Sequence, residues 1–111
     1  MLIGFKTTKL KKLLSDERQL SREYGASGGR KIARRLAVLA AAECLADIPT
    51  TPPTRRHQLK GDLDEQFAVD VEHPYRLLFK PDHTPVPRCQ DGGIDLTKVT
   101  AITILGVEDY H

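Results

Sequence analysis

Aromatic residues and cysteines are scarce in this sequence. Of 111 residues, three are Phe, three are Tyr and none is Trp, so a core must be built mainly from Leu, Ile, Val and Ala. Cys44 and Cys89 are too few for a disulfide framework, and they form no Cys-x-x-Cys pair or Cys/His cluster of the kind that binds zinc. We therefore expect two reduced thiols, no metal and no cofactor.

Long apolar runs are also missing. No stretch approaches the length of a membrane span, and Lys6 and Lys9 interrupt the N-terminal segment too early for the apolar core of a signal peptide. These two absences predict a soluble cytoplasmic protein without a membrane partner. The length suits one domain, which we expect to extend over residues 1–111.

Charge is divided unevenly along the chain. The formal net charge is +2, but residues 1–61 carry 13 Lys/Arg and 5 Asp/Glu, whereas residues 62–111 carry 4 and 10. A basic half is typical of a surface that binds a polyanion, and a solvated helix surface is the alternative explanation. The candidate contact residues are a basic strip on one predicted helix: Arg30, Lys31, Arg34 and Arg35.

Hydrophobic spacing changes from helical in the first half to alternating in the second. The first half predicts a strand at 1–6, a helix at 7–24, a glycine-rich turn at 25–29, a helix at 30–47 and a proline-rich linker at 49–56. The second half predicts a short segment at 57–61, strands at 67–71, 75–80 and 99–107, and an irregular surface loop at 81–98. This order predicts an α+β domain in which two N-terminal helices pack on one face of a small, mostly antiparallel sheet.

Three segments carry a more specific signal. The first is Arg56-His57-Gln58-Leu59-Lys60-Gly61, and the last is Asp109-Tyr110-His111. Between them, Phe67–Val71 leads through a turn to the strand Tyr75-Arg76-Leu77-Leu78-Phe79. In this order and spacing they resemble the HigB branch of the RelE-like toxins, which have a microbial-ribonuclease type of fold. The loop at 81–98 is longer than the turn usual in that family, and it could cover part of a site or add a contact surface.

The resemblance implies a type II toxin that cleaves messenger RNA on the ribosome and is silenced by a helix-turn-helix antitoxin. It implies a site made of His57, Lys60, Arg76, Asp109 and His111, with Tyr110 stacking on an RNA base. Such a ribonuclease uses the 2′-hydroxyl of its substrate as nucleophile. It needs a base, an acid and a cation that stabilises the phosphorane, and it needs no metal.

The chemistry of these residues suggests their roles. Asp109 and His57 are the candidate bases, and His111 is the candidate acid because histidine titrates near neutral pH. Arg76 presents a planar fork to phosphate oxygens, and Lys60 adds a point charge. In a regular strand Tyr110 would face away from Asp109 and His111, so a bend near Gly106 is expected.

Each of these residues also has a purely structural alternative. His57 could be an ordinary loop histidine, Lys60 a solvated lysine, and Tyr110 a cap on the core. Arg76 could pair with Asp70 or Glu72 across a hairpin. At the level of function, the alternatives are a ParE-like toxin, which acts on DNA gyrase without cleaving RNA, and an inactive relative that only binds RNA.

Overall fold

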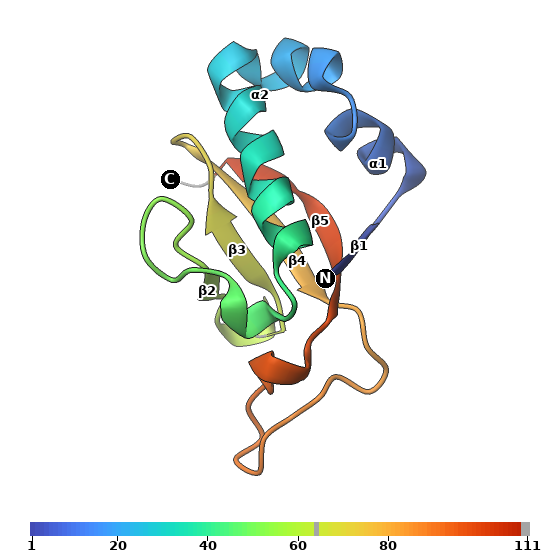
Figure 1. Cartoon of the computed structure of the whole chain (residues 1–111), viewed down its shortest axis with the longest axis vertical. Helices are drawn as coiled ribbons and strands as arrows, with labels where there is room; N and C mark the ends of the chain where they lie inside the picture. The colour runs from blue at the N-terminus through green and yellow to red at the C-terminus, as the bar shows by residue number, and fades with distance from the viewer. Residues whose placement is uncertain (64, 110–111) are drawn as a thin grey trace.

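The structure is a computed structural model that describes residues 1–63 and 65–109 (Figure 1). Its helices are α1 (Thr8–Leu14) and α2 (Glu17–Ala41), and its strands are β1 (Leu2–Phe5), β2 (His57–Gln58), β3 (Phe67–Asp70), β4 (Tyr75–Pro81) and β5 (Ala101–Asp109). Three short 3-10 helices complete it: η1 (Leu45–Asp47), η2 (Gly61–Leu63) and η3 (Leu96–Lys98).

The strands form one five-stranded sheet in the order β1-β5-β4-β3-β2. β1 runs parallel to β5, whereas each other neighbouring pair is antiparallel. Both helices lie on the same face of this sheet, and α2 crosses it diagonally (Figure 1). The predicted α+β class, with two helices on a mostly antiparallel sheet, is confirmed. We call the face without helices the open face.

The core lies between α2 and the sheet. Ile32 and Leu39 of α2 are fully buried, as are Leu77 and Phe79 of β4. The Phe79 ring stacks on that of Phe67, with centroids 5.9 Å apart. Burial of each large apolar side chain contributes roughly 1.5–3 kcal/mol, so this alternation on β4 fixes which face of the strand turns toward the helices.

The predicted helix boundaries were wrong in two places. α1 ends at Leu14 and not at residue 24, because the Asp16 carboxylate accepts a hydrogen bond from the Arg18 amide (2.9 Å) and begins a new helix. α2 ends at Ala41 and not at residue 47, because the chain leaves the helix so that Leu45 can be buried and bond to the Val99 carbonyl (2.9 Å).

The predicted glycine-rich turn is a kink inside α2. Only Gly25 departs from helical geometry, with φ 80° and ψ 163°, a conformation that disfavours residues with a Cβ. The kink brings the two parts of α2 together, since a Cβ added at Gly29 would lie 3.0 Å from the backbone of Leu20. Glycine is therefore needed at both positions, for different reasons.

The segment predicted as an irregular loop is largely irregular, apart from its first residue, one isolated bridge and η3 (Leu96–Lys98). β4 continues to Pro81, and beyond it Arg88 and Ile94 form an antiparallel bridge. Arg88 also makes a 2.7 Å ion pair with Glu65. The segment joins the end of β4 to the start of β5, so it lies at the opposite end of these strands from Tyr75 and Asp109 (Figure 1).

β5 contains the irregularity expected near Gly106. Leu78 pairs with Gly106 while Phe79 pairs with Ile104, so Leu105 is an extra residue that forms a bulge. The bulge shifts the alternation by one residue. Ile102 and Ile104 face the core before it, and Val107 packs against the core after it.

Candidate active site on the open face

The strand register brings two of the predicted catalytic residues to the open face. His57 on β2 pairs with Ala68, and Ala68 pairs with Leu78 on β4. Arg76 lies two residues before Leu78 and so shares its face. Leu77 and Phe79 face the core instead. The β2 and β4 backbones are two strand spacings apart, about 10 Å, a distance that side chains of this length can partly span.

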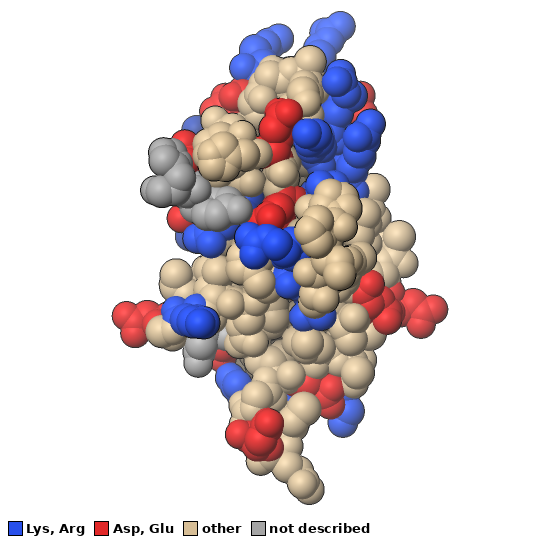
Figure 2. Space-filling model, turned by 90° about the vertical axis from the view of Figure 1, so that its left-hand side faces the viewer, with Lys and Arg blue, Asp and Glu red and all other residues tan. Residues whose placement is uncertain are grey.

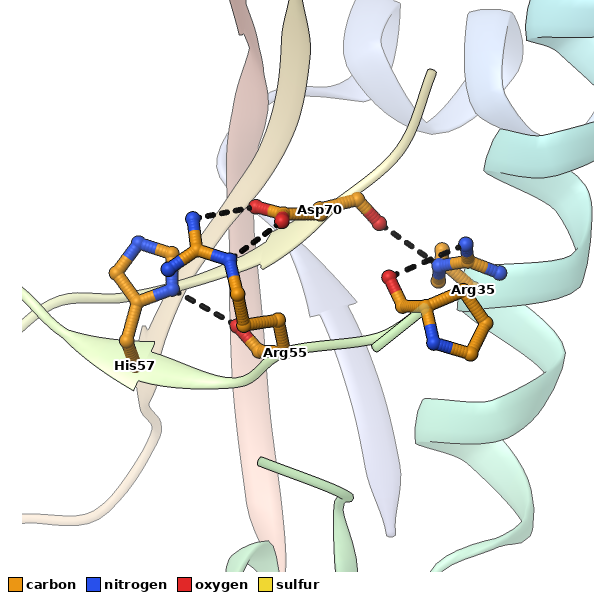
Figure 3. Close-up of polar contacts among 5 residues, drawn as sticks. Arg35, Arg55, His57 and Asp70 are labelled. Carbon is orange, nitrogen blue, oxygen red and sulfur yellow. Dashed lines mark hydrogen bonds and ion pairs between the residues drawn. The ribbon is translucent and has the colours of Figure 1, made fainter. Parts of the chain in front are cut away.

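The His57 ring has a defined tautomer. Its Nδ1 lies 2.8 Å from the backbone oxygen of Arg55 (Figure 3). A carbonyl oxygen only accepts hydrogen bonds, so Nδ1 must carry the proton. In the neutral ring Nε2 then has the lone pair, and Nε2 has no hydrogen-bond partner within residues 1–63 and 65–109. This is the state that a general base requires.

Arg76 is mostly covered, with its side chain 18% exposed, and its ion pair reaches across to β5. Nη2 lies 3.8 Å from the Glu108 carboxylate, which is 52% exposed. The sequence-based alternative paired Arg76 with Asp70 or Glu72. Asp70 lies opposite Arg76 in the register, and its carboxylate also binds Arg55, whereas Glu72 binds Lys31.

The other predicted catalytic residues lie apart or outside the described residues. Lys60 is exposed just after β2. Asp109 is opposite Tyr75, so the register places it on the face that carries Tyr75 and not beside Arg76. Tyr110 and His111 lie outside the residues that the structure describes.

A hollow on the open face is lined by two lysines, Lys6 and Lys80, that the sequence-based prediction did not include. It is lined by strand residues of this face, among them Lys80, Leu78, Thr103 and Glu108, by Gln66 just before β3 and by Lys6 just after β1. Lys80 alternates with Leu78 and Arg76 along β4, and this alternation is the signal that could have identified it. Lys6 carried no such signal, because the parallel β1–β5 pairing was not predicted.

The structure divides the predicted basic strip. Arg30 and Arg34 are exposed on α2. Figure 2 shows Lys and Arg side chains gathered over the upper part of one face of the molecule. Lys31 makes a 3.2 Å ion pair with Glu72. Arg35 is only 7% exposed, so its prediction as a surface contact was wrong.

Arg35 lies on the side of α2 that faces β3. Its Nε donates to the Asp70 carbonyl (2.7 Å), its Nη2 donates to the Pro53 carbonyl (3.4 Å), and burial lowers the pKa of its guanidinium.

Comparison with known proteins decides the family. The family model described as RelE-like toxin of type II toxin-antitoxin system HigB matches residues 3–87. The chain belongs to this family. The matched range includes His57, Lys60 and Arg76. The comparison with curated proteins finds no match.

A solved structure shares the fold of this HigB-like toxin. The YoeB/ParE toxin from Agrobacterium tumefaciens superposes with a TM-score of 0.57 over all of both chains, at 11% sequence identity. At that identity the similarity shows the fold alone. Membership of a type II toxin–antitoxin family implies an antitoxin as partner.

Two features are absent from the part of the chain that the structure describes. Among the described residues, no three His, Cys, Asp or Glu side chains gather in a way that could hold a metal ion. None of the helices in this part of the chain is long and apolar enough to cross a membrane.

Proposed function

We propose that this HigB-like toxin is an endoribonuclease that cleaves messenger RNA on the ribosome in the cytoplasm. The observation that carries the proposal is the tautomer of His57, whose Nδ1–H bonds to Arg55 while Nε2 is left to accept a proton on the same face as Arg76. A base and a phosphate-binding cation are two of the three groups that metal-free RNA cleavage needs.

The proposed reaction proceeds by in-line attack. His57 Nε2 takes the proton of a 2′-hydroxyl, and the 2′-oxygen attacks the adjacent phosphorus. The bond to the 5′-oxygen breaks, and that oxygen leaves with a proton from a general acid, for which His111 is the candidate. The Arg76 guanidinium stabilises the charge on the phosphorane. Lys80 adds positive charge on the same face, and Lys60 is a further cation just after β2. Asp109, the other candidate base, lies opposite Tyr75 on the helix-covered face, so His57 is the base we assign.

In this mechanism the ribosome, and not the toxin, positions the messenger RNA. The hollow on the open face is lined by side chains of β4 and β5 and by residues next to β1 and β3. A base stacked on Tyr110 would be the main specific contact that the protein supplies. The ribosome would hold the message in line, while Arg30 and Arg34 contact ribosomal RNA through its phosphates.

The products distinguish this mechanism from others. Cleavage of a translated message should leave a 2′,3′-cyclic phosphate on one fragment and a 5′-hydroxyl on the other, and a chelator should not slow it. We would test both by end-specific labelling of the fragments with and without EDTA. Fragments with 5′-phosphates, or strong inhibition by EDTA, would contradict the mechanism.

A second candidate is a ParE-like toxin that acts on DNA gyrase. The similar solved structure is named as a YoeB/ParE toxin, and the fold alone does not separate these two branches. A gyrase-binding toxin has no need of a histidine held as a base. Inhibition of gyrase supercoiling together with intact messages would favour this candidate, and ribosome binding without cleavage would indicate an inactive relative.

A further inference from the structure

Three residues bind Asp70 at the end of β3, and Figure 3 shows two of them, Arg35 and Arg55. The Asp70 amide donates to the Thr54 carbonyl (2.8 Å), and its carbonyl accepts from Arg35 Nε of α2 (2.7 Å). Its carboxylate accepts from Nε (2.6 Å) and Nη2 (3.0 Å) of Arg55. Asp70 therefore joins α2, β3 and the segment that leads into β2, where His57 lies.

Arg55 has a backbone conformation that its side chain must help to maintain. Its φ is +46°, in the left-handed region that residues with a Cβ disfavour, and it is the one non-glycine residue with positive φ in the described part of the chain. The Arg55 amide bonds to the Thr51 carbonyl (2.9 Å), and the bidentate pair with Asp70 holds the side chain. In this conformation the Arg55 carbonyl points at His57 Nδ1 (2.8 Å).

We propose that Arg55 and Asp70 are positioning residues that set the tautomer of the base. Their ion pair keeps Arg55 in the left-handed conformation, and the Arg55 carbonyl then holds the proton of His57 on Nδ1, so that Nε2 can accept the 2′-hydroxyl proton. Neither residue touches RNA in this account. The inference rests on the function proposed above, because it assigns Nε2 the role of base.

The Arg55–Asp70 pair acts on Arg55 through its bidentate geometry more than through its electrostatic attraction. The Arg55 and Asp70 side chains are 43% and 25% exposed, so water screens their attraction. The two parallel hydrogen bonds from the Arg55 guanidinium to the Asp70 carboxylate nevertheless fix the orientation of the Arg55 side chain, which a single contact between point charges does not. A histidine side chain in water prefers the proton on Nε2. Without the Arg55 carbonyl, His57 would therefore place a hydrogen where the base needs a lone pair.

The tautomer can be measured directly in the free toxin. Long-range ¹H–¹⁵N correlation spectra at a pH where His57 is neutral distinguish Nδ1–H from Nε2–H. We expect Nδ1–H in the wild type and a shift toward Nε2–H in Arg55→Ala and Asp70→Asn. Arg55→Lys keeps the charge, loses the fork and should lie between them. Arg88→Ala is the matched control, because it removes a 2.7 Å surface ion pair with Glu65 and should leave the tautomer unchanged.

The kinetic test uses the same variants on ribosomes programmed with a message. Misplacement of a reacting group by a remote change can cost about 10²-fold, so kcat should fall by up to that factor in Arg55→Ala and Asp70→Asn while KM changes little. Circular dichroism confirms that each variant is folded. Should Arg55→Ala not fold, Arg55→Lys and Asp70→Asn still provide the comparison.

The outcomes separate the two proposals. If the folded variants retain Nδ1–H, or if their tautomer shifts without a change in kcat, the positioning role is wrong. If the tautomer shifts as expected but the wild-type toxin does not cleave the message, the proposed function fails while the link from Asp70 to His57 stands.

Discussion

The ion pair between Arg76 and Glu108 is weak enough for a substrate phosphate to replace the Glu108 carboxylate. Its partner Glu108 lies 3.8 Å away and is half exposed, so their ion pair is worth at most about 1 kcal/mol. A phosphate that accepts both prongs of the guanidinium would make shorter, charge-assisted bonds. The same residue can therefore stabilise the sheet in the free toxin and a phosphorane during cleavage.

Substitution of Arg76 separates these two roles. Loss of one donor to a transition-state anion costs about 10²–10³ in rate, so we expect that fall for Arg76→Ala in single-turnover cleavage on ribosomes. Arg76→Lys should recover only part of the rate, because the fork is lost. Glu108→Gln shows what the ion pair contributes to the melting temperature. An Arg76→Ala toxin with normal cleavage and only a lower melting temperature would leave Arg76 a purely structural role.

The role of His111 is a prediction from the sequence. His111→Gln keeps size and hydrogen bonding but cannot donate a proton at neutral pH. It should slow cleavage by about 10²–10⁴, the range for a general acid, while ribosome binding persists. Growth inhibition in cells, together with circular dichroism of the purified variant, is the measurement. Full toxicity would remove His111 from the mechanism and assign the acid to another group.

For single residues, the sequence predicts which ones belong to the candidate site better than it predicts their contacts in the fold. The resemblance singled out His57 and Arg76, and the alternation along β4 could also have identified Lys80 on the same face. The roles of Arg35 and Arg55 could not be predicted. Both are charged side chains in polar stretches, and only the packing of α2 and of the segment before β2 against Asp70 determines their contacts.

At the scale of the elements, Glu72 in the turn between β3 and β4 binds two residues of α2. Its carboxylate accepts hydrogen bonds from Ser27 Oγ (2.8 Å) and Lys31 Nζ (3.2 Å). These bonds, that from Ser27 first, hold the pKa of Glu72 below its usual value. A carboxylate with a lowered pKa stabilises the fold above its unfolded pKa, and this contribution is lost as the pH falls through the folded pKa.

Glu72→Gln should therefore destabilise the toxin at neutral pH and become harmless in acid. The expected result is a lower free energy of unfolding at neutral pH, with the difference from wild type shrinking as the pH falls through the folded-state pKa of Glu72. Urea unfolding at a series of pH values measures it. A difference that stays constant with pH would mean that the charge of Glu72 plays no part.

The two sides of α2 should respond differently to loss of charge. Replacing Arg30 and Arg34 by Gln should weaken ribosome binding and flatten its salt dependence, because fewer phosphate contacts release fewer counterions. Arg35→Gln should instead lower stability by about 1–3 kcal/mol, since it disturbs buried hydrogen bonds to two carbonyls. Binding measured across salt concentrations, beside thermal unfolding, tests both. An unchanged salt slope for the Arg30/Arg34 variant would show that these residues are only solvated or serve the antitoxin.

Helix boundaries were predicted less well than the helices themselves. The leucines of α1 continue a helical spacing toward Leu20, and this hid the break that Asp16 makes by capping α2. In the segment from residue 82 to 98, prolines and glycines suggested irregular structure. The bridge between Arg88 and Ile94 and the ion pair with Glu65 depend on partners that no local pattern reveals.

For the molecule as a whole, the order of elements was enough to predict the class of fold. The parallel pairing of β1 with β5 was not predicted, because it joins segments almost a whole chain apart and leaves no trace in the local alternation. The same pairing brings Lys6 to the hollow on the open face. The sequence thus predicted the layers of the domain and singled out His57 and Arg76, but it did not predict that Lys6 and Lys80 share their face or that Asp109 lies on the other one.

The most direct test of ribosome-dependent cleavage compares the cleavage rates of one message in its free and its ribosome-bound state. Purified toxin is mixed with the message either free or bound to translating ribosomes, and the cleavage rates of wild type and His57→Gln are measured. The account predicts rapid cleavage on ribosomes, little on free RNA, and a loss of about 10²–10⁴ in the His57→Gln variant. Equal cleavage of free and ribosome-bound message, or an unimpaired His57→Gln toxin, would contradict it.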